Sequence, residues 1–230
     1  DVALKDHILD GNVKVIVQNG EGYTPQQYVA GQEYVKSRSI NITSSEYPTH
    51  NVDDTPREEY DFTFAIESDT QYYNEDYDDN PNQGNDGIYQ HQLNIHNWLL
   101  ANRVRMNIQY LFHDGDIIDD EQNQKEWEQA NAAYALLDSA GFPYGVLAGN
   151  HDVGHLNGSY NNYTTYFGEA RYASNPWYGG SYENNRGHYD LITVGGIDFI
   201  MVYMGWGIGD EEIAWLNDVL AQYPERKAIL

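Results

Sequence analysis

The sequence contains no cysteine and few basic residues. Without thiols the chain can form no disulfide, no thiolate zinc site and no cysteine nucleophile. Only 12 Lys and Arg residues stand against 36 Asp and Glu residues, which gives a formal net charge of −24. A surface this acidic repels phosphate backbones, so we expect no nucleic-acid-binding surface.

Long apolar runs are also missing from the sequence. No run approaches the roughly 18 residues that span a bilayer, so we predict no transmembrane segment, and no signal peptide is recognisable. The chain begins with Asp1 and not with Met. We therefore interpret it as a piece of a longer protein, whose targeting segment, if there is one, lies outside this chain.

Tyrosine is abundant, with 21 residues, and many Asn and Gly residues accompany it. Loops rich in these residues are typical of extracellular and cell-wall proteins, although Tyr also commonly fills half-buried positions. On composition we favour loops of an extracellular or cell-wall protein over half-buried Tyr residues. We expect a secreted or cell-surface protein, for which the cell wall is one possible partner.

Residues 1–59 differ in character from the rest of the chain. Val13–Gln18 alternates and is β-branched, which predicts a strand. Residues 43–57 are rich in Ser, Thr, Pro, Asp and Asn and resemble a linker. This N-terminal β-rich segment is either the tail of an upstream domain or an edge strand packed on the main domain, which we place at residues 60–230.

The main domain shows a βαβαβ pattern. Apolar, β-prone runs occur at 62–66, 108–112 and 144–148, and helical periodicity separates them at 88–106 and 122–139. This pattern predicts an α/β fold with a parallel sheet, whose chemistry is expected at the carboxyl ends of the strands.

The second half of the main domain is predicted in less detail. We expect a long loop over 152–187, then two strands at 188–194 and 198–203 with Gly195-Gly196 as the hairpin turn. A helix follows at 210–222. Residues 227–230 begin another β-prone run.

A polar segment follows each of the first three predicted strands. The segments are Ser68-Asp69-Thr70-Gln71, His113-Asp114-Gly115-Asp116-Ile117-Ile118-Asp119 and Gly149-Asn150-His151-Asp152. Asp69 and Gln71 alone would pass for an ordinary polar loop. Carboxylates, amides and a His that meet at one sheet edge predict a site for a hard metal ion.

A second acidic segment offers a weaker metal candidate. Asp76, Asp78 and Asn80 imitate the start of a calcium-binding loop, but Pro81 stands where a Gly is needed and no Glu closes the loop. We favour a solvated loop at the rim of the site.

Together the three polar segments resemble the calcineurin-like metallophosphoesterases. The family pattern is DxH, GDxxD, GNH(D/E), a lone His and GHxH. The counterparts of the first three motifs occur here in that order over residues 60–230, and the first reads Asp69-Thr70-Gln71. The details resemble the secreted or cell-wall phosphoesterases of Gram-positive bacteria. The resemblance implies a sandwich of central β-sheets flanked by helices, and a site for two divalent metal ions.

The resemblance also implies which residues would bind the metal ions. Asp69 and Gln71 would bind the first ion, Asp116 would bridge both ions, and Asn150 would bind the second. The ions would hold a hydroxide for attack on phosphorus. Asp119 would support the ligands without binding metal itself.

His151 and Asp152 would be the catalytic residues by the same resemblance. His151 would protonate the leaving oxygen or stabilise the charge on the phosphoryl group. Asp152 would orient His151 through a hydrogen bond. Arg186 and His188 are candidate substrate contacts, and for Arg186 a loop salt bridge on this acidic surface is the alternative.

Two features depart from the family pattern. Gln71 replaces the usual His, and a neutral amide oxygen favours Mn or Mg, and also Ca, over Zn or Fe. The lone His and GHxH would follow the strand that begins at Lys227, whereas the sequence ends at Leu230. We therefore expect a fold that is incomplete at the C-terminus, which binds at most one ion weakly and has little or no activity.

The function predicted from the sequence is metal-dependent hydrolysis of phosphomonoesters or phosphodiesters, in what we interpret as a fragment of a larger surface enzyme. The alternative is a non-catalytic cell-surface binding module on a phosphoesterase scaffold, whose Tyr-rich loops would hold a wall polymer.

Overall fold

A computed structural model describes residues 56–74, 88–154 and 158–230. Contacts divide the chain into two units, Asp1–Tyr60 and Asp61–Leu230. The described part of the first unit holds only a short 3-10 helix, η1 (Arg57–Glu59). The predicted strand at 13–18 and the calcium-like segment at 76–80 lie outside the described residues. No helix among the described residues is long and apolar enough to cross a membrane.

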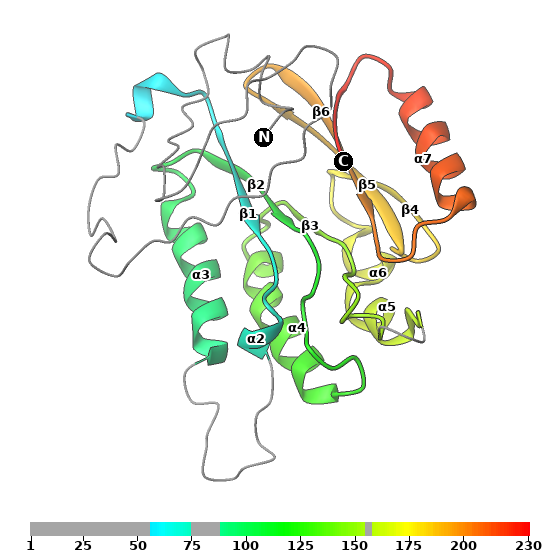
Figure 1. The fold of residues 1–230 in the computed structure, drawn as a ribbon. Helices are drawn as coiled ribbons and strands as arrows, with labels where there is room; N and C mark the ends of the chain where they lie inside the picture. The colour runs from blue at the N-terminus through cyan, green and yellow to red at the C-terminus, as the bar shows by residue number, and fades with distance from the viewer. Residues whose placement is uncertain (1–55, 75–87, 155–157) are drawn as a thin grey trace, which may run out of the picture. The chain divides into compact units, whose positions relative to one another are not determined.

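The predicted parallel βαβαβ unit is confirmed in the second unit (Figure 1). Its strands β1 (Thr63–Glu67), β2 (Ile108–His113) and β3 (Tyr144–Val146) pair in that order, with α3 (Ile88–Asn102) and α4 (Gln124–Ser139) as the connecting helices. Glu67 pairs with His113, and His113 pairs with Val146. The three strands therefore end level, and their following loops start at one edge of the sheet.

A second, mixed sheet packs against the first. It contains β4 (Tyr178–Tyr182), β5 (Gly187–Val194), β6 (Ile197–Met204) and β7 (Lys227–Ile229) in that order. β5 and β6 form the predicted hairpin, and both turn glycines have a positive φ, as the tight two-residue turn requires. β7 pairs with β6 in parallel after the predicted helix α7 (Asp210–Gln222).

Alternation along β2 decides how these layers pack. Leu111 faces the helices and joins the cluster around Trp127 and Tyr134 of α4. Tyr110 and Phe112 face the opposite way, toward the second sheet. Tyr110 belongs to the cluster that contains Met201 and Tyr203 of that sheet, and Phe112 packs against this cluster. On the outer face of that sheet, Val219 of α7 forms a cluster with Ile200 and Val202 of β6. Each fully buried apolar side chain contributes roughly 1.5–3 kcal/mol, so the core holds both sheets and their helices together.

Two segments predicted as loops contain regular structure. Within 152–187 the chain forms α5 (Asn161–Phe167), α6 (Glu169–Tyr172) and β4. They are stabilised by the buried aromatic residues Tyr163, Phe167 and Tyr172. The acidic segment after β1 begins with a short helix, α2 (Gln71–Asn74). In contrast, α3 ends at Asn102, before the predicted Met106. Arg103 N donates to Leu100 O, three residues back, and Asn107 adopts a positive φ in the turn into β2.

Candidate active site

The loops that follow β1 and β2 are joined through their backbones. Asp69 N donates to Gly115 O at 3.2 Å, and Gln71 N donates to Asp116 O at 2.9 Å. A third bond runs from Asp114 N to Glu67 O at 3.1 Å. These bonds bring two of the three predicted ligand segments side by side at the level edge of the first sheet.

Both candidate aspartate ligands have an unusual backbone conformation. The φ angle is 52° at Asp69 and 54° at Asp116. This left-handed region costs a non-glycine residue on the order of 1–3 kcal/mol and tends to occur at functional sites. The hydrogen bonds between the two loops keep the backbone in this conformation, and two carboxylates are thereby presented from neighbouring loops.

The loop after β3 lies against Asp116. A Cβ atom on Gly149 would be 2.8 Å from Cγ of Asp116, and one on Gly115 would be 2.8 Å from Gly149 N. His151 N donates to Oδ1 of Asp116 at 3.0 Å. The two glycines therefore permit the close approach, and the amide of His151 fixes the carboxylate. Asn150, between Gly149 and His151 in the sequence, is half-buried.

Gln71 presents an amide oxygen of the kind that a hard cation binds. The side chain is buried, and Nε2 donates to Oδ1 of Asp119 at 3.4 Å. Oε1 has no hydrogen-bond partner among the described residues. A buried, unpartnered oxygen is costly, and binding of a cation would compensate for that cost.

His151 is oriented by Asp119. Its Nδ1 lies 2.9 Å from the backbone carbonyl and 3.1 Å from Oδ1 of Asp119. Burial alone would lower the pKa of His151, but the bond to the carbonyl of Asp119 and the carboxylates of Asp116, Asp119 and Asp152 raise it. Asp119 thus has the contact that we expected of Asp152.

The structure corrects the role that we expected for Asp152. Its carboxylate is fully buried and accepts three backbone bonds, from Ile117 N (2.8 Å), Ile118 N (3.1 Å) and Gly149 N (2.7 Å). Burial raises the pKa of Asp152 to about 7, although the bonds from these amides work against the shift. The carboxylate points inward because it satisfies these amides, and it ties the loops after β2 and β3 together.

A buried ion pair behind the loops was not found by sequence reasoning. Oε2 of Glu67, the last residue of β1, lies 3.0 Å from Nε2 of His96 on α3. His96 Nδ1 is 2.9 Å from the carbonyl of Ala133 on α4. Burial raises the pKa of Glu67, but the bond and charge of His96 outweigh it and the net shift is downward. A signal existed, because Glu67 closes an apolar strand and His96 lies on a helix face otherwise directed at the core.

Three comparisons show which known proteins this chain is similar to. The family model described as Calcineurin-like phosphoesterase matches residues 62–229. The chain belongs to the calcineurin-like phosphoesterase family. It is 43% identical over 215 residues to "Uncharacterized protein YvnB" of Bacillus subtilis (strain 168), a match that covers 94% of this chain and 15% of that protein. The chain thus spans about a seventh of the length of this relative.

A solved structure also resembles the chain. It is the purple acid phosphatase PPD1 isolated from yellow lupin (Lupinus luteus) seeds, with 19% identity and a TM-score of 0.41 over 69% of this chain and 27% of that one. The α/β fold expected from the sequence, two sheets flanked by helices, is confirmed by the family match together with the observed layers.

Arg186 and His188, the two residues predicted to contact the substrate, have other contacts in the structure. Arg186 lies 2.6 Å from Glu212 and 3.1 Å from Glu183, and its guanidinium stacks over the ring of Tyr160. The loop salt bridge is therefore what the structure shows. His188 is not a wall residue, because it is 1% exposed and its ring stacks on Tyr203 with the centroids 4.4 Å apart.

The candidate ligands of the chain meet part of what a hard divalent cation needs. The described residues contain no group of three or more His, Cys, Asp or Glu side chains placed to hold a metal. The candidate ligands are instead the carboxylates of Asp69 and Asp116 and the amides of Gln71 and Asn150. Oxygen donors of this kind suit Mn, Mg or Ca, and the unpartnered oxygen of Gln71 is the observation that supports a cation.

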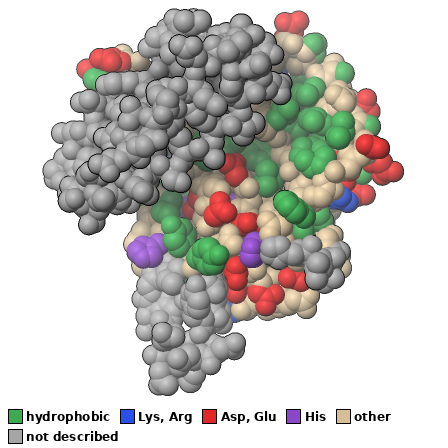
Figure 2. All heavy atoms as spheres, in the orientation of Figure 1, with side chains coloured by type: hydrophobic (Ala, Val, Ile, Leu, Met, Phe, Trp, Pro, Cys, Tyr) green, Lys and Arg blue, Asp and Glu red, His purple; other side chains and the backbone are tan. Residues whose placement is uncertain are grey.

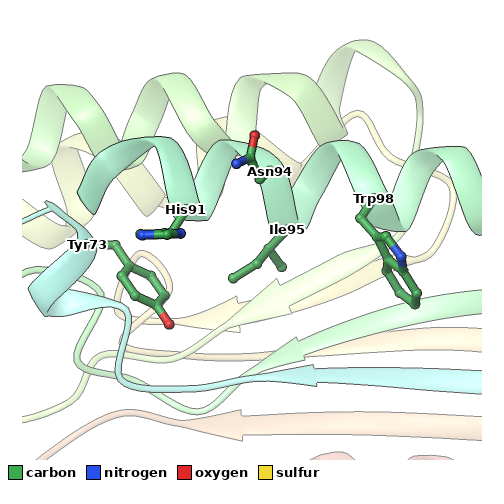
Figure 3. Close-up of a pocket in the computed structure, with 5 residues that line it drawn as sticks. All are labelled: Tyr73, His91, Asn94, Ile95 and Trp98. Carbon is green, nitrogen blue, oxygen red and sulfur yellow. The ribbon is translucent and has the colours of Figure 1, made fainter. Parts of the chain in front are cut away.

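A groove in the described residues lies away from these ligands. It has a volume of about 440 Å³ and runs along α3, where Tyr73, His91, Asn94, Ile95 and Trp98 line it (Figure 3). An adjoining groove of about 450 Å³ follows the outer edge of β1. None of the candidate ligands lines either groove, so we do not assign the chemistry to them.

Proposed function

We propose that this chain carries the site of a metal-dependent phosphoric ester hydrolase that acts on phosphomonoesters or phosphodiesters. Membership of the family supports metal-dependent phosphoester hydrolysis. The observation that carries the proposal is the meeting of three loops at one sheet edge. His151 N fixes the Asp116 carboxylate there, Gln71 N is bonded to the backbone carbonyl of Asp116, and the buried amide oxygen of Gln71 has no hydrogen-bond partner among the described residues.

The residues take the following roles in the proposal. Asp69, Gln71, Asp116 and Asn150 would hold one or two divalent cations, with Mn or Mg favoured by the oxygen donors. When bound, such cations activate water and neutralise charge on the phosphoryl group. His151 would transfer a proton to the leaving oxygen. Its bonds to Asp119 hold the imidazole in one orientation.

The setting of the enzyme is part of the proposal. A secreted or cell-surface location with cell-wall association is supported by the many Tyr residues and the Asn and Gly residues that accompany them. A larger parent enzyme is supported by the 15% share of YvnB that the match covers. On the face seen in Figure 2 acidic side chains outnumber basic ones, so bound cations would also be needed to attract an anionic substrate.

A second candidate function is a non-catalytic binding module on the same scaffold. It is favoured by the absence, among the described residues, of three acidic or imidazole side chains that could hold a metal together. In this case the chain would bind a surface polymer and turn over no phosphoester.

The test is a panel of aryl phosphate monoesters and diesters assayed with Mn²⁺. We expect turnover below the typical enzyme value of about 10 s⁻¹, and its loss in Asp116→Asn. That variant removes a negative charge from the carboxylate expected to contact both ions. Asp218→Asn, an exposed aspartate on α7, is the matched control and should leave turnover unchanged.

Three outcomes separate the two candidates. Turnover that depends on Asp116 supports the hydrolase. Absence of any turnover, whether or not calorimetry detects bound Mn²⁺, supports the binding module. If Asp116→Asn left both Mn²⁺ affinity and turnover unchanged, the assignment of the metal ligands would be wrong.

A further inference from the structure

The side chain of Thr70 lies on the buried side of the candidate site, between two of the candidate ligands in the sequence. It is fully buried, and its hydroxyl is 3.0 Å from Nε2 of His113, the last residue of β2. The same hydroxyl donates to the backbone carbonyl of Ile117 at 3.3 Å. The pair therefore joins the loop after β1 to the loop after β2 from within the protein.

The hydrogen bonds determine which nitrogen of His113 carries the proton. Gly115 N donates to Nδ1 of His113 at 3.1 Å, so Nδ1 is an acceptor. Nε2 then carries the proton and donates to Thr70, and the hydroxyl hydrogen of Thr70 is left to reach Ile117. Burial lowers the pKa of His113 to about 4, so the ring is neutral at neutral pH. The bonds thus run in one direction, from His113 through Thr70 to Ile117.

This chain of bonds contacts the backbone on both sides of Asp116. It accepts from the N–H of Gly115, just before Asp116, and donates to the carbonyl of Ile117, just after it. The φ angle of 54° at Asp116 needs such support from its surroundings. On the other loop, Thr70 follows Asp69, whose φ angle is 52°.

We propose that Thr70 and His113 are positioning residues for the candidate metal ligands of both loops. Neither side chain would touch the metal, because both are occupied by the bonds described above. They would hold the carboxylates and the amide in place before a cation arrives, and ligands that are prearranged bind more tightly. The inference rests on the proposed function, since it gives both residues a role toward a divalent cation.

The decisive experiment is titration of the metal-free full chain with Mn²⁺ by calorimetry. Thr70→Val keeps the shape of the side chain and removes the hydroxyl, and we expect Mn²⁺ affinity to fall by about 10–100-fold. Thr70→Ser restores the hydroxyl and should restore most of the affinity. Thr63→Val removes a comparable hydroxyl bond, to Met106 O, at the opposite end of β1, and should leave the affinity unchanged.

A second readout does not depend on metal. The ¹⁵N shifts of the His113 side chain should show a neutral ring that is protonated on Nε2, in wild type and in Thr70→Ser. A ring protonated on Nδ1 would contradict the direction of the bonds and overturn the proposal.

The outcomes distinguish this proposal from the proposed function. If the wild-type chain binds no Mn²⁺, both are lost. If wild type binds Mn²⁺ and a folded Thr70→Val binds it equally well, only the positioning role is overturned. If Thr70→Val does not fold, His113→Gln replaces it, because its amide nitrogen can take the place of Nε2. His113→Gln should bind Mn²⁺ more tightly than His113→Asn, and equal or reversed affinities would overturn the role.

Discussion

At the scale of single residues, Asp119 has taken over the role expected of Asp152. Asp119 contacts the imidazole of His151, whereas Asp152 accepts three backbone amides in the interior. Both residues occupy loop positions of similar character, so their spacing in the sequence does not reveal which one turns inward. The direction of each side chain depends on which amides the neighbouring loop leaves for it.

His151 should act in the chemical step and not in metal binding. Replacing it in His151→Gln is expected to lower kcat by about 10²–10⁴-fold, the usual contribution of a general acid, while metal content stays the same. The measurements are steady-state kinetics with Mn²⁺ and elemental analysis of the dialysed protein. Asp119→Asn should lower kcat less, because the carbonyl of Asp119 still contacts Nδ1. Loss of metal in His151→Gln would instead identify His151 as a ligand.

At the scale of elements, the loop after β3 and the loop after β2 act as one unit. Gly149 and Gly115 approach each other so closely that neither leaves space for a Cβ atom. The close approach places the carboxylate of Asp116 over the backbone of Gly149, where His151 N fixes it. A change in either glycine should therefore affect metal binding through the position of Asp116.

Gly149→Ala tests this coupling. The new methyl group would overlap the carboxylate and the backbone of Asp116, so we expect a loss of about 1–3 kcal/mol in the free energy of unfolding together with weaker Mn²⁺ binding. Gly141→Ala is the comparison. It strains a positive φ but has no atom within 4 Å of the new methyl group, so it should lower stability only. Unchanged Mn²⁺ affinity in a folded Gly149→Ala would contradict the coupling.

The elements with strong sequence patterns could be predicted, and the short ones could not. Apolar runs and helical periodicity located the first three strands, α4, α7 and the glycine hairpin. The two helices α5 and α6 are too short to be stable alone, and the packing of Tyr163, Phe167 and Tyr172 stabilises them. The meeting of the candidate ligand loops could also be predicted, because parallel strands that end level start their following loops at one edge of the sheet. The bonds of Thr70, His113 and His96 depend on tertiary contacts that spacing does not encode.

At the scale of the whole molecule, polar side chains join the two sheets inside an aromatic core. Tyr110 of β2 donates to Asp190 of β5, and Tyr203 of β6 donates to Tyr110 at 3.1 Å. His188 stacks on Tyr203, and neither of its ring nitrogens has a hydrogen-bond partner among the described residues. Burial raises the pKa of Asp190 to about 8 and lowers that of His188 to about 3. The native interior therefore holds both groups neutral over much of the pH range.

The two groups should make stability depend on pH in opposite directions. The folded pKa of Asp190 lies above its ordinary value of 3.8, so its contribution is complete below pH 3.8 and is lost as the pH rises toward about 8. The folded pKa of His188 lies below its ordinary value of 6.5, so its contribution is complete above pH 6.5 and is lost as the pH falls toward about 3. Each group changes the free energy of unfolding by about 1.4 kcal/mol per pH unit within its window.

Both effects can be measured by urea unfolding between pH 3 and pH 9, with a chelator present to remove metal ions. Each effect is the difference in the free energy of unfolding between wild type and one variant. The free energy of wild type minus that of Asp190→Asn should fall as the pH rises from about 4 to about 8. The difference from His188→Phe, which keeps an aromatic ring against Tyr203, should rise from about pH 3 to about pH 6.5. Other titrating groups cancel in these differences because they are common to both proteins. A difference curve for Asp190→Asn that stays flat across its window would mean that Asp190 is ionised in the folded protein, and the sheets would then be joined by a buried charge instead of a neutral hydrogen-bonded pair.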